Sequence, residues 1–126
     1  MAHTIFIVDD DPDMIEIMTL ILESHGHRVG SSLAGTDAIP KIAAQKPDCV
    51  LTDLMMAELD GLHLCAELRA RKDLGNMTII VVSARDHPYW QERAREFGAD
   101  GYIVKPLDPK TFAATVEDFI GGGGTA

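Results

Sequence analysis

Two apolar segments of this chain each end in carboxylic acids. Residues 5–8 are followed by Asp9, Asp10 and Asp11, and residues 48–52 are followed by Asp53. Short apolar runs with β-branched members, closed by polar residues and followed by a helical pattern, are typical of buried parallel strands. Because ligands of open α/β sheets bind beyond the carboxyl ends of the strands, these acids are expected to share one site.

Two further apolar segments end in groups that can take part in chemistry: residues 77–82 precede Ser83, and residues 101–104 precede Lys105. Several carboxylates in one place need a counter-charge, which a hard divalent cation with oxygen ligands commonly supplies. Mg²⁺ is the natural candidate, because it binds through one or two carboxylates and leaves room for a phosphoryl group. Lys105 would bring a positive charge to a phosphoryl oxygen, and Ser83 would donate a hydrogen bond. The pattern predicts a phosphoryl-transfer site.

The rest of the chain predicts the elements that hold these residues. Five strand segments alternate with five helical patterns, the helices expected at residues 12–25, 36–45, 61–72, 88–97 and 108–120. This alternation is typical of an α/β fold with a doubly wound, five-stranded parallel sheet. We expect a flavodoxin-like (βα)5 fold with strand order 2-1-3-4-5. Its switch point lies between the first and third strands, where Asp9, Asp10 and Asp53 would meet.

Local signals indicate where several helices begin. Asp11 is an acidic cap and Pro12 suits the first helical position. Thr36 is expected to cap the second helix, which would place Pro40 within its first turns, where proline is tolerated. The fourth helix, residues 88–97, is unusually polar. It would rest on few contacts, and low local stability suits a moving part.

Composition limits the kind of protein. With 126 residues and a mass of 13.7 kDa, the chain fits one domain, expected at residues 1–120, followed by a glycine-rich flexible tail or linker at 121–126. No apolar stretch is long enough to span a bilayer and the N-terminus lacks signal-peptide features, so a cytoplasmic location is expected. Met1 favours an N-terminal or stand-alone domain. The net charge of −9 argues against direct nucleic acid binding by this domain.

The cysteines and histidines are expected to have no catalytic role. Cys49 lies in a predicted strand and Cys65 on the apolar side of a predicted helix, which indicates reduced core thiols. The five histidines lack the spacing of metal ligands. His25 and His27 are expected in a solvated turn.

Residues 4–120 resemble the receiver domains of bacterial two-component response regulators. Four segments match the motifs of that family: Val8-Asp9-Asp10 its acidic pair, residues 51–56 with Gly61 its phosphoacceptor segment, residues 82–84 its switch hydroxyl, and Lys105-Pro106 its lysine and following proline. Any one of these matches is weak alone, but together and in register they are specific.

The resemblance implies a phosphoacceptor domain. Asp53 would take a phosphoryl group from a phosphohistidine on a histidine kinase or phosphotransfer protein, with Lys105 and Ser83 assisting. The Mg²⁺ would be held by Asp9, Asp10, Asp53 and the backbone carbonyl of Met55. Such a domain is not an enzyme in the usual sense, since it catalyses only its own phosphorylation and dephosphorylation.

The resemblance also implies a switch. Ser83 would move toward the phosphoryl group, and Tyr102 would turn inward, which changes the surface of the fourth helix, fifth strand and fifth helix. That surface would control an unidentified output domain or target protein. Simple strand packing is about as good an explanation for Tyr102. The mixed charges of the fourth helix also suggest a homodimer that forms on phosphorylation.

The chain departs from the family's pattern at Ala57, where the family usually has proline. We expect altered rates there rather than lost activity, because none of the implied ligands changes. Met55 and Arg85 flank the expected path of the attacking water, so they are expected to tune the lifetime of the aspartyl phosphate.

The sequence disfavours three other functions. A phosphatase of the haloacid dehalogenase type would need a second acid two residues after Asp53, where Met55 stands. A nucleotide-binding Rossmann or flavodoxin-like domain is disfavoured because no G-x-G-x-x-G follows the first strand. A phosphorylation-independent interaction module with the same fold would usually lack one of the acids or the lysine, and this chain has all of them.

Overall fold

The computed structural model of this chain describes residues 2–56, 59–74 and 76–122. Its five strands form one parallel sheet in the order β2-β1-β3-β4-β5, which confirms the predicted α/β fold and strand order. The strands are β1 (Thr4–Val8), β2 (Arg28–Ser32), β3 (Cys49–Thr52), β4 (Thr78–Ser83) and β5 (Gly101–Val104). The helices are α1 (Pro12–Ser24), α2 (Gly35–Gln45), α3 (Gly61–Ala70), α4 (Pro88–Glu96) and α5 (Phe112–Ile120), with a short 3₁₀ turn at Lys72–Leu74.

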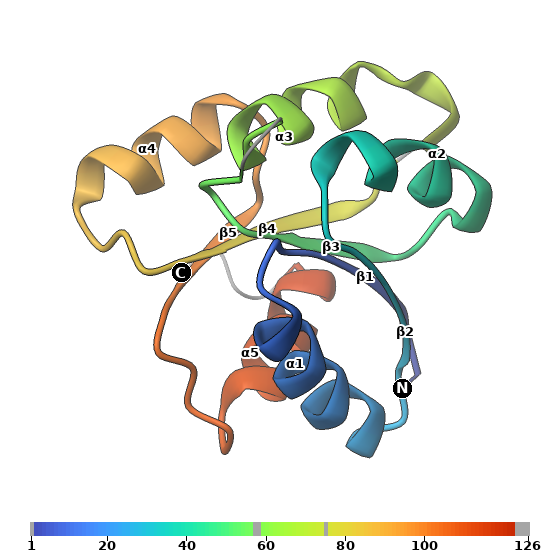
Figure 1. The fold of residues 1–126 in the computed structure, drawn as a ribbon, viewed down its shortest axis with the longest axis vertical. Helices are drawn as coiled ribbons and strands as arrows, with labels where there is room; N and C mark the ends of the chain where they lie inside the picture. Colours follow the sequence, from blue (N-terminus) through green and yellow to red (C-terminus); the bar gives the residue numbers. More distant parts are fainter. Residues whose placement is uncertain (1, 57–58, 75, 123–126) are drawn as a thin grey trace.

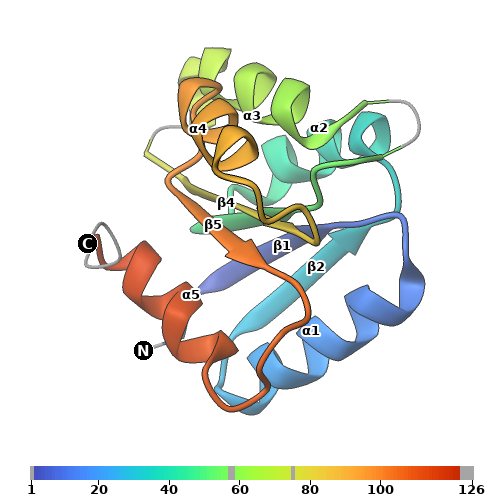
Figure 2. The same ribbon diagram turned by 90° about the vertical axis from the view of Figure 1, so that its left-hand side faces the viewer.

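Helices cover both faces of the sheet (Figures 1 and 2). On one face α2, α3 and α4 pack over a core built around Phe6, Val50 and Val81. On the other face α1 and α5 pack over a second core that includes Ile7 and Leu51. Successive strand residues therefore alternate between two buried layers, which explains why the strands are apolar throughout.

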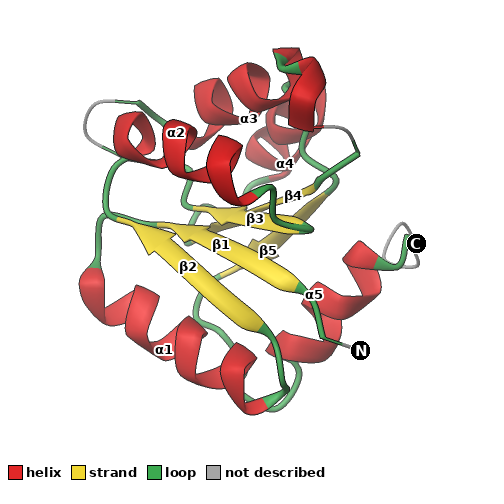
Figure 3. Ribbon diagram, turned by 90° about the vertical axis from the view of Figure 1, so that its right-hand side faces the viewer, coloured by secondary structure: helices red, strands yellow, loops and turns green. Residues whose placement is uncertain are grey.

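The strands all run in the same direction, so their carboxyl ends lie along one edge (Figure 3). Val8 is in register with Thr52 at the ends of β1 and β3. Ser83 is in register with Val104 at the ends of β4 and β5. The residues that follow these positions are consequently delivered to the same edge of the sheet.

The start of α1 follows the sequence prediction. Asp11 is its N-cap residue, and the Asp11 carboxylate accepts a hydrogen bond from the backbone N–H of Asp13 at 3.0 Å. Pro12 occupies the first turn, where a backbone N–H has no helical partner. Gly26 follows the helix with φ of 89°, a conformation that glycine adopts without strain. The first helix is thus defined by local chemistry at both ends.

Two predicted helix starts are wrong. Helix α2 begins at Gly35 with Ala34 as its N-cap residue, so Thr36 lies inside the first turn and is not the cap. Helix α5 begins at Phe112 rather than at residue 108. Asp108 instead begins a turn. Its carboxylate accepts a hydrogen bond from the Lys110 N–H at 2.9 Å, and its carbonyl accepts one from the Thr111 N–H at 3.1 Å. Local side-chain bonding has replaced the helix there.

The prediction of a solvated turn is wrong for His27. Its side chain is fully buried, and Nε2 lies 2.7 Å from the Glu117 carboxylate of α5. Its Nδ1 accepts a hydrogen bond from the backbone N–H of His3 at 3.0 Å. The two cysteines, by contrast, are free and buried as expected, and burial raises the pKa of the Cys65 thiol to about 12.

The polar fourth helix is anchored lightly, as predicted, with Ala94 as its buried residue. Across the described parts of the chain, no helix combines the length and apolar character needed to cross a membrane. Helix α5 ends at Ile120, and Gly121 and Gly122 follow it. Ala57, the departure from the family's proline, and residues 123–126 of the glycine-rich tail lie outside the described residues.

Candidate functional site

Three carboxylates converge where β1 and β3 end. Asp9, Asp10 and Asp53 each offer an oxygen, and these oxygens all lie within 4.8 Å of one another. Asp9 is buried, Asp53 is partly buried, and Asp10 is exposed. The strand register explains the meeting, because Asp9 and Asp53 follow the paired residues Val8 and Thr52. Carboxylate oxygens are the ligands that a hard divalent cation takes, so the donor set fits Mg²⁺.

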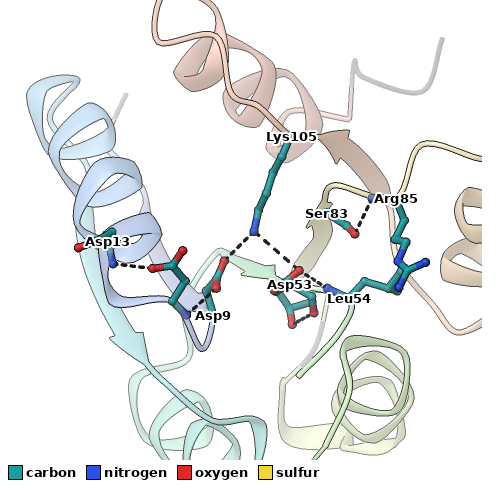
Figure 4. Close-up of polar contacts among 9 residues, drawn as sticks. Asp9, Asp13, Asp53, Leu54, Ser83, Arg85 and Lys105 are labelled. Atoms are coloured by element: carbon teal, nitrogen blue, oxygen red, sulfur yellow. Dashed lines mark hydrogen bonds and ion pairs between the residues drawn. The ribbon is translucent and has the colours of Figure 1, made fainter. Parts of the chain in front are cut away.

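Asp53 is held at both its backbone and its side chain. Its N–H donates to the Val8 carbonyl at 2.9 Å, which continues the β1–β3 ladder by one bond. Its carboxylate Oδ1 accepts a hydrogen bond from the Leu54 N–H at 2.8 Å (Figure 4). The carboxylate therefore has a defined orientation toward the end of the sheet.

Lys105 extends from the end of β5 toward the acids (Figure 4). Its Nζ lies 3.1 Å from Asp9 Oδ2 and 3.8 Å from Asp53 Oδ1. Its backbone N–H donates to the Ser83 carbonyl at 2.8 Å, which ties the start of the following loop to the end of β4. The Lys105-Pro106 peptide bond is cis. The positive charge of Lys105 thus lies among the acids.

Burial is the largest cause that raises the pKa of Asp53 above its ordinary value. The Lys105 charge and the Leu54 N–H oppose this rise in the pKa, whereas the charges of Asp9 and Asp10 add to it. A carboxylate kept from water beside two other acids is a costly arrangement without an added cation. The site is therefore short of positive charge.

Ser83 and Tyr102 are linked through Arg85. The buried Ser83 Oγ accepts a hydrogen bond from the Arg85 N–H at 3.1 Å, and the Tyr102 hydroxyl donates to the Arg85 carbonyl at 2.7 Å. The Arg85 guanidinium lies over the ring of Trp90 in α4, 5.7 Å from its centroid. The loop after β4 is thereby connected to both α4 and β5.

The structure brings Asp9, Asp10, Asp53 and Lys105 together, as the sequence predicted. Ser83 lies at the end of the neighbouring strand β4. Met55 follows two residues after Asp53 and is 49% exposed. Their roles in catalysis or metal binding stay predictions.

Two groups that hold Asp53 were not predicted from the sequence, the Leu54 N–H and the Thr52 hydroxyl. The Leu54 N–H cannot be recognised there, because every residue except proline has such a group. Thr52 does leave a signal, since it is the one hydroxyl residue in an otherwise apolar strand, Cys49–Thr52. It is fully buried, and its Oγ1 donates a hydrogen bond to the Asp53 carbonyl at 2.9 Å.

A surface hollow of about 500 Å³ lies elsewhere, near the amino ends of β4 and β5. The Arg69 guanidinium at this hollow already donates to the carbonyls of Gly98 and Met77 and pairs with Asp100. The Arg69 guanidinium is therefore used by the fold, and we assign the hollow no ligand.

Residues 5–117 match the family model described as the response regulator receiver domain. The chain belongs to this family. The receiver domain is 32% identical over 117 residues to the alkaline phosphatase synthesis transcriptional regulatory protein PhoP of Bacillus subtilis. That alignment covers 93% of this chain but 48% of PhoP, so the chain spans about half the length of this curated relative.

Solved structures of related proteins support the same family. A putative response regulator from Chloroflexus aurantiacus superposes with a TM-score of 0.90 at 27% identity, covering 96% of this chain and 99% of that one. The receiver domain of the sensor histidine kinase PA1611 from Pseudomonas aeruginosa, with a magnesium ion coordinated in its active-site cleft, superposes with a TM-score of 0.85 at 26% identity. It covers 96% of this chain and 99% of that one. This chain is thus a signalling domain of two-component systems.

Proposed function

We propose that Asp53 is the phosphoacceptor of this receiver domain and takes its phosphoryl group from a phosphohistidine. The observation behind this assignment is the group of three acids within 4.8 Å, with Lys105 Nζ 3.1 Å from Asp9 and 3.8 Å from Asp53. Asp53 is the member of the group that lies at the end of the central strand β3 with its carboxylate oriented by a backbone N–H.

The carboxylates of Asp9, Asp10 and Asp53 would hold Mg²⁺ together with the backbone carbonyl of Met55. The donor set supports this, and so does the magnesium ion coordinated in the related PA1611 receiver domain. When bound, Mg²⁺ supplies positive charge that lets the acids stay ionised together and neutralises phosphoryl oxygens.

In the reaction, a carboxylate oxygen of Asp53 forms a bond to phosphorus while the bond between phosphorus and the donor's imidazole nitrogen breaks. The electron pair of that bond leaves with the imidazole. Lys105 holds a positive charge where the phosphoryl oxygens gain negative charge, and the Ser83 hydroxyl donates a hydrogen bond to another oxygen. Loss of the phosphoryl group to water, catalysed by the same domain, is the second half of this proposal, and Met55 and Arg85 tune its rate.

The signal would pass through the loop after β4. If Ser83 turns toward the phosphoryl group, its bond with the Arg85 N–H breaks, and this frees the loop that the Tyr102 hydroxyl now holds. Tyr102 then turns inward. Helix α4 has Ala94 as its buried anchor, which supports a shift of the surface formed by α4, β5 and α5.

Receiver domains interact with histidine kinases and with output domains. For this chain we propose a cytoplasmic location, with a histidine kinase or phosphotransfer protein as its donor. An output domain or target protein would recognise the α4, β5 and α5 surface. A homodimer through the α4 face, formed on phosphorylation, is a further part of this proposal.

Intact mass spectrometry tests the phosphoacceptor assignment. The parent chain, Asp53→Asn and the matched variant Asp86→Asn are incubated with acetyl phosphate, with and without Mg²⁺. We expect a gain of one phosphoryl group in the parent and in Asp86→Asn that requires Mg²⁺, and no gain in Asp53→Asn. Equal labelling of Asp53→Asn would assign the acceptor to another residue. No labelling of the parent by acetyl phosphate or by a phosphohistidine donor would refute the proposed function.

Sedimentation velocity tests the dimer separately. Phosphorylated parent is expected to sediment faster than the unmodified chain, whereas Asp53→Asn treated in the same way is not. An unchanged profile for fully phosphorylated protein would count against the dimer and leave the phosphoacceptor assignment intact.

A further inference from the structure

Thr52 has a polar group in a place that packing alone would fill with an aliphatic side chain. It belongs to β3, whose four residues are all buried, and its own exposure is 0%. The other three residues of the strand are apolar. A buried hydroxyl needs a hydrogen-bond partner, and Oγ1 of Thr52 finds one in the Asp53 carbonyl oxygen at 2.9 Å.

This carbonyl belongs to the same peptide unit as the Leu54 N–H. A peptide unit is planar, so the direction of its C=O determines the direction of its N–H. The Leu54 N–H in turn donates to Asp53 Oδ1 at 2.8 Å. The Thr52 hydroxyl, the peptide unit between residues 53 and 54, and the Asp53 carboxylate therefore form one continuous chain of contacts.

The same carbonyl oxygen is also confined by α3. A Cβ atom at Gly61 would overlap the Asp53 carbonyl oxygen, so the helix approaches this oxygen as closely as a glycine permits. The Gly61 N–H also donates to the Leu54 carbonyl of the following peptide unit at 2.8 Å, which fixes the position of α3 beside this loop. The peptide unit is thus held by Thr52 from the strand and by Gly61 from the helix.

We infer that Thr52 is a positioning residue for phosphoryl transfer: its hydroxyl orients the peptide unit whose N–H holds the Asp53 carboxylate. This inference rests on the proposed role of Asp53 as the phosphoacceptor. Thr52 touches neither the phosphoryl group nor the metal in this scheme. It acts by limiting the rotation of the carboxylate that must approach phosphorus in line.

The test compares Thr52→Val with Thr52→Ser. Valine keeps the branched shape and removes the hydroxyl, whereas serine keeps the hydroxyl and removes a methyl group. Thr78→Val, at the far end of β4, is the matched control for loss of a strand threonine hydroxyl. Urea unfolding is measured for all three variants, so that each rate is compared at a known fraction of folded protein.

The first readout is the rate of phosphorylation at saturating Mg²⁺ over a range of acetyl phosphate concentrations. We expect the maximal rate of Thr52→Val to fall by about 10-fold, the loss caused by partial misplacement of a reacting group. Thr52→Ser should recover most of the parent's rate, and Thr78→Val should equal the parent. A purely structural role would instead lower the rates of Thr52→Val and Thr52→Ser in proportion to their loss of folded protein.

The second readout does not depend on phosphorylation. Hydrogen exchange of the Leu54 amide, followed by NMR, should be faster in Thr52→Val than in the parent and restored in Thr52→Ser. If the Leu54 amide of Thr52→Val exchanged at the parent's rate, the inference would be overturned. Faster exchange of this amide with an unchanged rate of phosphorylation would overturn it as well. If the parent itself takes up no phosphoryl group, the proposed function fails, and so does the inference that Thr52 positions Asp53 for transfer. The amide exchange then shows only whether Thr52 orders this peptide unit.

Discussion

Lys105 makes its shorter ion pair with Asp9 and not with Asp53. Its Nζ lies 3.1 Å from the buried carboxylate of Asp9, compared with 3.8 Å from Asp53. Asp9 is also one of the three acids proposed to hold Mg²⁺. In the proposed site the lysine would therefore neutralise a carboxylate that Mg²⁺ also needs, and the two cations would compete for it.

Replacement of Lys105 by methionine should for this reason strengthen Mg²⁺ binding. Removing a positive charge beside the site is worth on the order of 1 kcal/mol between partly solvated groups, which corresponds to roughly five-fold in affinity. Isothermal titration with MgCl₂ measures the affinity for Mg²⁺, and Lys105→Arg is the control variant that keeps the charge. The same methionine variant should be phosphorylated much more slowly, because it lacks the charge proposed to contact the phosphoryl group. Weaker Mg²⁺ binding by Lys105→Met than by the parent would contradict this account.

Asp53→Asn should stabilise the metal-free domain at neutral pH. Burial raises the pKa of Asp53 above its value of 3.8 in the unfolded chain. As the pH rises, the unfolded state therefore loses this proton first, and the ionised carboxylate disfavours the folded state above the raised pKa. We expect the melting temperature at pH 7 to increase by roughly 2–6 °C, the shift that about 1 kcal/mol produces in a domain of this size.

Calorimetry checks this prediction at several pH values. The gain in Asp53→Asn should shrink as the pH falls below the raised pKa of Asp53, and it should vanish below 3.8, where the parent's Asp53 is protonated in both states. It should also shrink when Mg²⁺ is added, because the cation stabilises only the parent's ionised carboxylate. Asp86 is exposed in the loop after β4, so the control variant Asp86→Asn should show neither effect. A lower melting temperature for Asp53→Asn than for the parent at pH 7 would refute the argument.

The pair formed by His27 and Glu117 ties α5 to the turn after α1. Nδ1 of His27 accepts from the His3 N–H, so in the neutral ring Nε2 is the donor to the Glu117 carboxylate at 2.7 Å. That hydrogen bond is the main cause that lowers the pKa of Glu117 below 4.5, with a smaller contribution from His25. An acid whose pKa is lowered in the folded state stabilises the fold at pH values above its pKa in the unfolded chain. This stabilisation is lost as the pH falls through the pKa of the folded state.

Glu117→Gln should accordingly lower the free energy of unfolding at pH 7 by about 0.5–1 kcal/mol, a modest amount because Glu117 is partly exposed. Urea unfolding at pH 7 and near pH 4 measures the change, which should be smaller in acid. Asp118→Asn, the exposed neighbour in the same helix, is the matched control. Equal effects of the two substitutions at pH 7 would show that loss of helix charge, and not the bond to His27, is responsible.

Sequence reasoning succeeded where the evidence is local and periodic. The apolar strands, the cap at Asp11 and the lightly anchored α4 follow from neighbouring residues. The meeting of Asp9 with Asp53 also follows, because parallel strands bring their carboxyl ends to one edge.

It failed where the deciding partner is distant in the chain or is a backbone group. His27 is buried because of a carboxylate 90 residues away, which no local pattern around residues 25–27 can reveal. The Thr52 hydroxyl bonds a backbone carbonyl, so its partner has no side-chain signature. At Asp108 an aspartate followed by proline fits both a helix cap and a separate turn, and the turn's own hydrogen bonds decide between them.

Gly61→Ala should disturb the acceptor loop from the helix side. The added Cβ would meet the Asp53 carbonyl oxygen and the backbone of Leu54, none of which is the flexible end of a side chain. Relief requires that α3 or the loop after β3 move, which costs about 1–3 kcal/mol for an overpacked buried position. Because Asp53 belongs to that loop, its rate of phosphorylation should fall as well.

Gly121→Ala is the control for the substitution itself, since a Cβ there makes only ordinary contacts, 3.5 Å or more from the carbonyls of α5. It should leave both stability and the rate of phosphorylation near those of the parent. Urea unfolding and the acetyl phosphate reaction are measured on both variants. If Gly61→Ala were as stable and as reactive as Gly121→Ala, the close approach of α3 to Asp53 would not be needed to hold the acceptor, and the confinement of its peptide unit would have to come from Thr52 alone.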